Sequence, residues 1–191
     1  MRKIILTGFG PFGELQSNPT EKLIHSLEET LENELYQFFV LPVSYSYCSG
    51  WSEKHISDEV CLVIHFGVSA KSEVIQLERS GRNIAGSTKD VDGNCHGSKI
   101  LKDGPEKIQS SLDLKRLCKQ MNGADFQCEV SDNAGDYLCN FILYKSLCVA
   151  AEKTLFVHVP PESKMPISEL KEFTLEMIRN LLAQVETNTI Q

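Results

Sequence analysis

The chain has 191 residues, enough for one domain with a substantial core, which we expect to span residues 1–191. Its net charge is −7 and no basic stripe is present, so we expect no nucleic-acid partner, and the first apolar run is too short to predict a signal peptide or a membrane anchor. The seven cysteines include no C-x-x-C pair, which predicts reduced thiols in a cytoplasmic protein and no metal site.

The first strand signal is the apolar run "KIIL", residues 3–6, and the glycine-rich stretch "TGFGPFG", residues 7–13, follows it. These glycines fit G-x-G-x-x-G, the pattern of a dinucleotide-binding loop. In that fold the last glycine lies in the first turn of a helix, where free N–H groups face the phosphates. Here the helix signal comes later, with Asn18 as a good N-cap and Pro19 suited to the first helical position. The stretch therefore predicts a loop that stands off from the helix and does not bind a nucleotide.

Two other features of this loop point to a different ligand. Pro11 removes an N–H group that a phosphate would need. Phe9 and Phe12 place aromatic rings among the glycines. We therefore expect the loop to bind a small, flat and largely uncharged group.

Strand-like and helix-like patterns alternate along the rest of the chain. The strand-like runs cover residues 3–6, 36–43, 60–66, 73–77, 126–131 and 154–159. The helical patterns cover residues 18–31, 113–121, 137–153 and 168–185. This order predicts a three-layer α/β/α sandwich with a mainly parallel twisted sheet, in which ligands bind at the carboxyl ends of the strands. Residues 87–106 lack periodicity and are expected to form a long, functional loop.

A reactive cysteine is expected where strand 126–131 leads into helix 137–153. Cys139 would lie in the first helical turn, where the helix dipole favours the thiolate and free N–H groups can bind an oxyanion. The alternative is that Cys139 is a small buried residue. That is the role we expect for Cys148, deep in the same helix.

A thiolate nucleophile needs a base, and the base needs an orienting group. His158 lies at the carboxyl end of a buried strand, and His65 has a similar position in another strand. Glu78 follows a further apolar run, and an acidic side chain at such a position either pairs with another group or, more often, faces water. A Cys–His–Glu arrangement is one interpretation, and geometry must decide it.

Five motifs in order resemble those of the pyroglutamyl-peptidase I family of cytosolic cysteine peptidases, with the animal members most similar. They are "TGFGPFG" (7–13), "HFGVS" (65–69), "LERSGRN" (77–83), "SDNAGDYLCN" (131–140) and "FVHVPP" (156–161). The resemblance implies that Cys139 is the nucleophile, His158 the general base and Glu78 the carboxylate that orients it. His65 then has a structural role.

The resemblance also implies a pocket for the neutral 5-oxoproline ring. Phe9 and Phe12 match the aromatic residues that hold this ring. Tyr137 and Leu138 match further pocket wall, and Val68 matches a position whose backbone contacts the lactam. The implied substrates are pyroglutamyl-blocked peptides, and no cofactor is needed.

The sequence departs from the family pattern in two places. The connection of residues 44–55 looks shorter than the usual helical crossover. Lys89 lies in the loop where many bacterial members carry an arginine, and a lysine lacks the planar fork of that side chain.

Three alternatives differ in class. A non-catalytic homologue would bind blocked peptides without cutting them, although all three expected catalytic residues are present. A glutamine amidotransferase would place its cysteine between glycines, and Cys139 has none beside it. A nucleotide-binding protein is disfavoured by the loop, and a monomer is favoured over a homo-oligomer.

Overall fold

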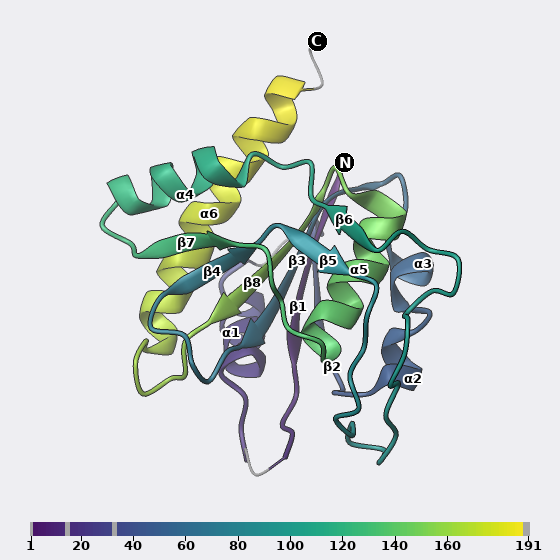
Figure 1. Ribbon diagram of the computed structural model, residues 1–191. Helices are drawn as coiled ribbons and strands as arrows, with labels where there is room; N and C mark the ends of the chain where they lie inside the picture. The colour runs from purple at the N-terminus through teal and green to yellow at the C-terminus, as the bar shows by residue number, and fades with distance from the viewer. Residues whose placement is uncertain (1, 14–15, 32–33, 189–191) are drawn as a thin grey trace.

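The expected strands form one six-stranded sheet in the computed structural model, which describes residues 2–13, 16–31 and 34–188 (Figure 1). The order across the sheet is β2-β1-β3-β8-β4-β7. The strands are β1 (Lys3–Phe9), β2 (Tyr36–Leu41), β3 (Val60–Val68), β4 (Ile75–Glu78), β7 (Cys128–Ser131) and β8 (Thr154–Val159).

The sheet is mainly parallel, as predicted, with one change of direction. β2, β1, β3 and β8 pair in parallel, whereas β4 is antiparallel to β8 and parallel to β7. Because of this reversal, Glu78 at the end of β4 lies opposite Phe156, inside β8, and not at the carboxyl edge of the parallel strands. An acidic residue is thereby placed within the sheet.

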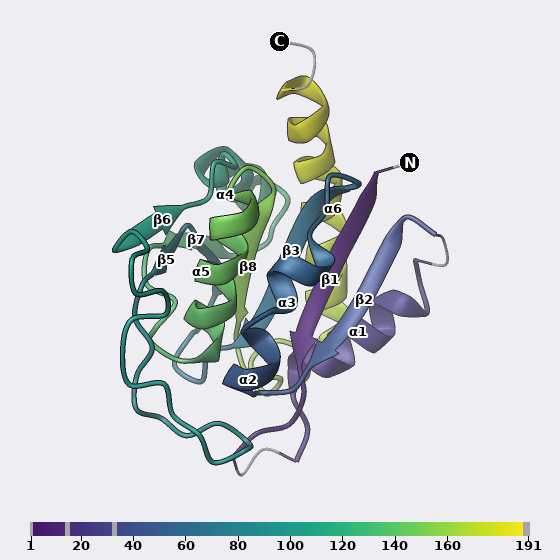
Figure 2. The same ribbon diagram turned by 90° about the vertical axis from the view of Figure 1, so that its right-hand side faces the viewer.

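Helices cover both faces of the sheet, which confirms the predicted three-layer architecture (Figure 2). The helices are α1 (Pro19–Glu28), α2 (Tyr45–Cys48), α3 (Trp51–His55), α4 (Leu114–Gly123), α5 (Leu138–Ala150) and α6 (Ile167–Asn188). One apolar cluster packs α1, α4 and α6 against the sheet, and a second packs α2, α3 and α5 against it. Residues 44–55, the connection that looked short, form the two small helices α2 and α3.

A second, two-stranded sheet was not predicted. It pairs β5 (Ser80–Arg82) with β6 (Lys107–Gln109) in antiparallel fashion. Each strand has only three residues and neither contains an apolar run, so the sequence carries no strand signal there. The segment between them, which includes the predicted loop 87–106, contains no helix and only one isolated bridge, Ala85 to Ser98.

The loop after β1 takes its shape from close packing with α1. The Asn18 side chain caps α1 by accepting a hydrogen bond from the Thr20 N–H at 3.0 Å, as predicted. A Cβ atom on Gly8 would lie 2.4 Å from the Thr20 carbonyl oxygen, so only glycine fits there. Gly13 adopts a φ of 57°, in the left-handed region that favours glycine. These glycines therefore serve helix packing and a tight turn.

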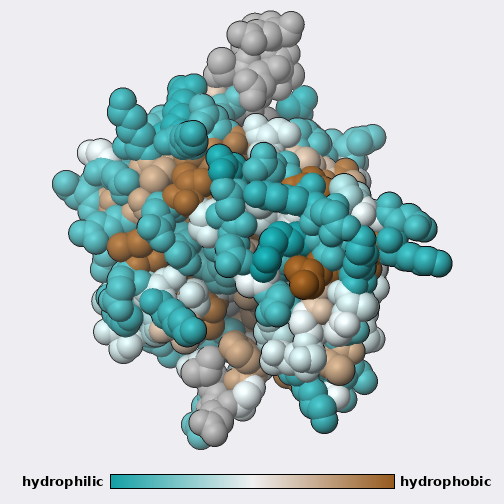
Figure 3. All heavy atoms as spheres, in the orientation of Figure 1, coloured by the Kyte–Doolittle hydropathy of each residue, from teal (hydrophilic) through white to brown (hydrophobic). Residues whose placement is uncertain are grey.

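The face of the molecule in Figure 3 is largely hydrophilic, with hydrophobic residues in small separate areas. Within residues 2–13, 16–31 and 34–188, no helix is both long and apolar enough to cross a membrane.

Candidate active site

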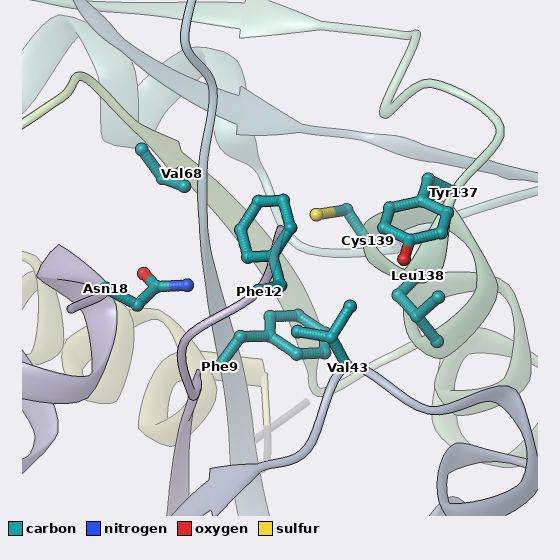
Figure 4. A pocket seen from close by; sticks show the side chains of 8 residues that line it. All are labelled: Phe9, Phe12, Asn18, Val43, Val68, Tyr137, Leu138 and Cys139. Atoms are coloured by element: carbon teal, nitrogen blue, oxygen red, sulfur yellow. The ribbon is translucent and has the colours of Figure 1, made fainter. Parts of the chain in front are cut away.

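A small pocket lies beyond the end of β1, between the glycine-rich loop and the start of α5 (Figure 4). Its lining residues are Phe9, Phe12, Asn18, Val43, Val68, Tyr137, Leu138 and Cys139. All five residues expected to bind the ring are among them, and they surround the sulfur of Cys139. The non-atom space at the pocket is about 260 Å³, part of it open to solvent, which is too small for a dinucleotide.

The first pocket wall is anchored to the sheet and to α1. Phe9 is the last residue of β1, and its N–H donates to the Thr20 hydroxyl at 2.9 Å. The Asn18 amide donates to the carbonyl of Gly10 at 3.1 Å, which fixes the loop that carries the partly buried Phe12. Asn18 was predicted only as a helix cap, and its second role in the pocket depends on the tertiary position of the loop.

The pocket lining also includes a residue that sequence reasoning missed, and it lies beside Phe9 (Figure 4). Val43 follows β2 and lines the pocket because β2 pairs with β1 in parallel, which brings the ends of both strands to the same edge. The register sets Phe9 opposite Leu41, two residues before Val43. The sequence offered no local signal for this, since Val43 is one of several apolar residues in its run.

Cys139 lies in the first turn of α5, as predicted. Tyr137 is the N-cap and Leu138 the first helical residue. The Phe141 N–H bonds to the Tyr137 carbonyl at 3.0 Å and begins the helical pattern. Three backbone N–H groups come before Phe141 in the helix, those of Leu138, Cys139 and Asn140. N–H groups at the start of a helix have no acceptor within the helix. They can therefore receive negative charge that develops next to the sulfur.

The side chain of Asn140 holds this first turn in place. Its carbonyl oxygen accepts from the Arg82 N–H at 2.9 Å, and its amide donates to the carbonyls of Arg82 and Ile84 at 2.8 Å. Asn140 is fully buried, so these bonds are shielded from water. Asn140, the residue after Cys139, is thus fixed to β5, which begins two residues after Glu78. Sequence reasoning did not identify it.

Gly67 leaves the space that the sulfur occupies. A Cβ atom at this position would lie 2.8 Å from Cys139 Sγ and 2.7 Å from Phe156 Cζ. Both distances are shorter than a carbon atom tolerates, so any side chain at Gly67 would displace the sulfur. Gly67 also pairs with His158 between β3 and β8, which places the histidine beside the same site.

His158 and Glu78 form a buried pair. The register sets His158 opposite Gln76, so Glu78 is its diagonal neighbour, two residues further along the antiparallel strand and on the same face. The Nδ1 atom of His158 lies 2.8 Å from Glu78 Oε1. Glu78 is completely buried, and its Oε2 atom has no hydrogen-bond partner among the described residues. The carboxylate therefore has the imidazole as its counterion, and the Nε2 atom remains free for the thiol.

The charges of the site favour a protonated imidazole. Burial alone would lower the pKa of His158, but the charge and hydrogen bond of Cys139, followed by those of Glu78, raise it to about 10. The raised pKa of His158 places a proton donor with a positive charge beside the sulfur of Cys139.

The other histidine is enclosed elsewhere. His65 is fully buried, with Nδ1 2.7 Å from the Thr7 hydroxyl and Nε2 2.9 Å from the Ser146 hydroxyl. Burial lowers the pKa of His65 to about 3, so it stays neutral. This placement fits a structural role that fastens α5 to the sheet.

The prediction for Cys148 was wrong. Cys148 is exposed, not buried, because it lies on the outward side of α5, whereas Leu147 and Ala150 in the same turn are buried. The side chain of Lys89 is exposed as well, and the residue contributes its backbone carbonyl to the site, as an acceptor for the Tyr137 hydroxyl at 2.8 Å.

Comparisons with known proteins place the chain in a family. Residues 2–184 match the family model of pyroglutamyl peptidase. Human pyroglutamyl-peptidase 1 is 35% identical over 176 residues, which cover 85% of this chain and 81% of the human protein. The pyrrolidone-carboxylate peptidase of Oceanobacillus iheyensis is 31% identical over 88% of both chains. Among solved structures, pyrrolidone carboxyl peptidase from the hyperthermophile Pyrococcus furiosus superposes with a TM-score of 0.86 and 26% identity, over 96% of this chain and 99% of that one. By its sequence and its fold, the chain belongs to the pyroglutamyl peptidase family of cysteine peptidases.

Proposed function

We propose that the protein is an exopeptidase that removes an N-terminal pyroglutamyl residue from peptides through a thioester on Cys139. The observation that carries this proposal is the placement of Cys139 at the meeting point of two structures. One is the buried His158–Glu78 pair, and the other is a small pocket lined mainly by apolar and aromatic side chains.

The pocket suits a neutral lactam. Its lining residues include no acidic or basic side chain, so a charged α-amine would lose its hydration without gaining a counterion. The 5-oxoproline ring is uncharged and flat, and it packs between Phe9 and Phe12 on one side and Tyr137 on the other. Asn18 and the backbone at Val68 supply polar groups at the pocket for the lactam amide.

The reaction follows from the geometry. The Cys139 thiolate attacks the pyroglutamyl carbonyl carbon, and the N–H groups at the start of α5 stabilise the oxyanion. The protonated His158 donates its proton to the leaving amine, which leaves a thioester. His158 then accepts a proton from water, which attacks the thioester and releases 5-oxoproline. Glu78 holds the imidazole and balances its positive charge throughout.

The test is turnover of a fluorogenic pyroglutamyl amide by the purified protein. We expect hydrolysis that iodoacetamide abolishes and that a chelator does not change. The matched prolyl amide, which has the same ring size but a charged secondary amine, should be a poor substrate. No turnover, together with measurable binding of pyroglutamyl peptides, would identify a non-catalytic homologue instead.

Phe12→Ala tests the ring pocket. Removal of one large apolar contact should weaken binding of the ring by roughly 1–3 kcal/mol, seen mainly as a higher KM. Alkylation of Cys139 by iodoacetamide should change little, because this small reagent does not need the pocket. Unchanged KM, or binding of NAD or ATP detected by calorimetry, would mean that the loop has another ligand.

Glu78→Gln tests the charge of the site through its pH dependence. Because the folded-state pKa of His158 is raised to about 10, the imidazolium persists to about that pH and is lost as the pH rises through it. The activity of the unmodified protein should therefore fall only near pH 10 on the alkaline side. In Glu78→Gln the carboxylate charge is gone, so the pKa of His158 decreases and the alkaline fall in kcat/KM moves to lower pH.

The control for this experiment is Glu73→Gln, which removes an exposed charge shortly before the same strand. Its pH profile should match that of the unmodified protein. If kcat/KM of Glu78→Gln falls at the same alkaline pH as that of the unmodified protein, Glu78 does not act on His158 by charge.

A further inference from the structure

We infer that residues 86–94, which we call the strap, determine the ring size that the protein accepts. The strap fixes the distance between two parts of the pocket wall, the segment that follows β2 and the segment that begins α5. The inference rests on the proposed function, because it concerns the substrate of the same pocket. The strap lies in the long connection between β5 and β6, which runs past α5 and α2 toward the loop after β1 (Figure 2).

One end of the strap is bonded to the wall at the start of α5. The Gly86 N–H donates to the Asp136 carbonyl at 2.6 Å, and the Tyr137 hydroxyl donates to the Lys89 carbonyl at 2.8 Å. A Cβ atom on Gly86 would lie 2.6 Å from the Asp136 carboxylate, so the two segments are in close contact. Tyr137 lines the pocket, and its hydroxyl is therefore held by the strap while its ring faces the ligand space.

The other end is bonded to the wall that follows β2. The Val91 N–H donates to the carbonyl of Val43, another lining residue, at 3.0 Å. The Ser44 hydroxyl donates to the Asp92 carboxylate at 2.6 Å. The strap thus contacts Val43 and Tyr137, which are far apart in the sequence and lie on different sides of the same pocket.

Asp90 connects these two sets of bonds. One carboxylate oxygen accepts from the N–H groups of Asp92 at 3.0 Å and Asn94 at 2.8 Å, which closes the turn of the strap. The other oxygen accepts from the Tyr45 N–H at 2.9 Å, which ties the turn to the wall after β2. The side chain is 7% exposed, so all three bonds are largely shielded from water. Burial alone would raise the pKa of Asp90, but these hydrogen bonds keep it below its ordinary value.

A rigid connection between two walls has a specific consequence. An apolar pocket distinguishes ligands that differ by one methylene group by about 10–200-fold only if its walls cannot move apart. The strap supplies that resistance, because a larger ring would have to stretch charge-assisted hydrogen bonds to Asp90. The protein should therefore prefer the five-membered lactam of pyroglutamate to the six-membered lactam of 6-oxopipecolic acid.

Two variants test the strap. Asp90→Asn has one carbonyl oxygen in place of two equivalent acceptors, so it cannot serve both the turn and Tyr45. Tyr137→Phe keeps the ring in the pocket and removes only the hydroxyl that binds the Lys89 carbonyl. The measurement is kcat/KM for matched fluorogenic amides of the two lactams. In each variant we expect the preference for the five-membered ring to fall by about tenfold, with a raised KM for the pyroglutamyl amide and a smaller change in kcat.

The control is Asp103→Asn, which removes an exposed charge from the same connection outside the strap and should leave the preference unchanged. If Asp90→Asn does not fold, Tyr137→Phe decides alone. A folded variant whose ring preference equals that of the unmodified protein would overturn the inference, even if its kcat is lower. Failure of the unmodified protein to cleave the pyroglutamyl amide would instead contradict the proposed function.

Discussion

Cys139→Ala is expected to lower kcat/KM for a pyroglutamyl amide by about 10⁴-fold or more, because no other group at the site can form the thioester. The protein should remain folded. The change removes one sulfur atom from a partly buried position, and the bonds that fix the first turn of α5 come from Asn140. Circular dichroism and thermal unfolding would verify the fold, and steady-state kinetics would measure the loss.

The chain offers a matched control in Cys148→Ala. Cys148 belongs to the same helix and is exposed, so its replacement should leave both activity and stability within a small margin of the unmodified protein. The stoichiometry of inactivation by iodoacetamide gives a second readout, since loss of activity should follow modification of Cys139 and not of Cys148. Substantial turnover by Cys139→Ala would assign the nucleophile to a different residue.

The second large effect is expected at His158. His158→Ala removes the group that, in the proposed reaction, activates the thiol and protonates the leaving amine, so kcat/KM should fall by about 10³-fold or more. This variant also leaves the buried Glu78 carboxylate without its partner, which destabilises the fold. His158→Asn separates the two effects. An asparagine amide can still donate to Glu78, but it provides no base.

We therefore expect His158→Asn to be nearly as inactive as His158→Ala and more stable than it. Glu78→Gln should lose less activity than either, because an amide can still orient the imidazole. His65→Ala should give the reverse pattern. Loss of its bonds to Thr7 and Ser146 should lower the melting temperature, whereas kcat/KM should persist at temperatures where the protein is folded. If His65→Ala is inactive while folded and His158→Ala is active, the base has been assigned to the wrong histidine.

Local patterns predicted the elements well and the contacts between them only in part. The cap at Asn18 and the helix start before Cys139 depend on a few adjacent residues, and both are confirmed. The burial of Glu78 could not be predicted, because its partner is 80 residues away and the reversal of β4 is a property of the whole sheet. Val43 and Gly67 were missed for the same reason, since only strand pairing brings them to the site.

The error at Cys148 has a separate cause. Helix α5 is apolar over most of its circumference, so its periodicity does not show which face is buried. The last turn carries two neighbouring exposed apolar residues, Cys148 and Val149, although the residue before them, Leu147, is buried. Only the rotation of the helix about its own axis decides which face is buried, and packing with distant segments sets that rotation.

The position of β8 in the sheet has a consequence for how the protein is made. β8 lies between β3 and β4, yet its residues, Thr154–Val159, follow both of those strands in the chain. During synthesis, β3 and β4 therefore each present an unpaired edge until the ribosome has released β8, and such edges are prone to pair with other chains. His158, the proposed base, enters with that same strand, so the proposed active site and closure of the sheet arise in one step. Nascent chains that stop before Thr154 should then depend on chaperones, and they should contain no active fraction.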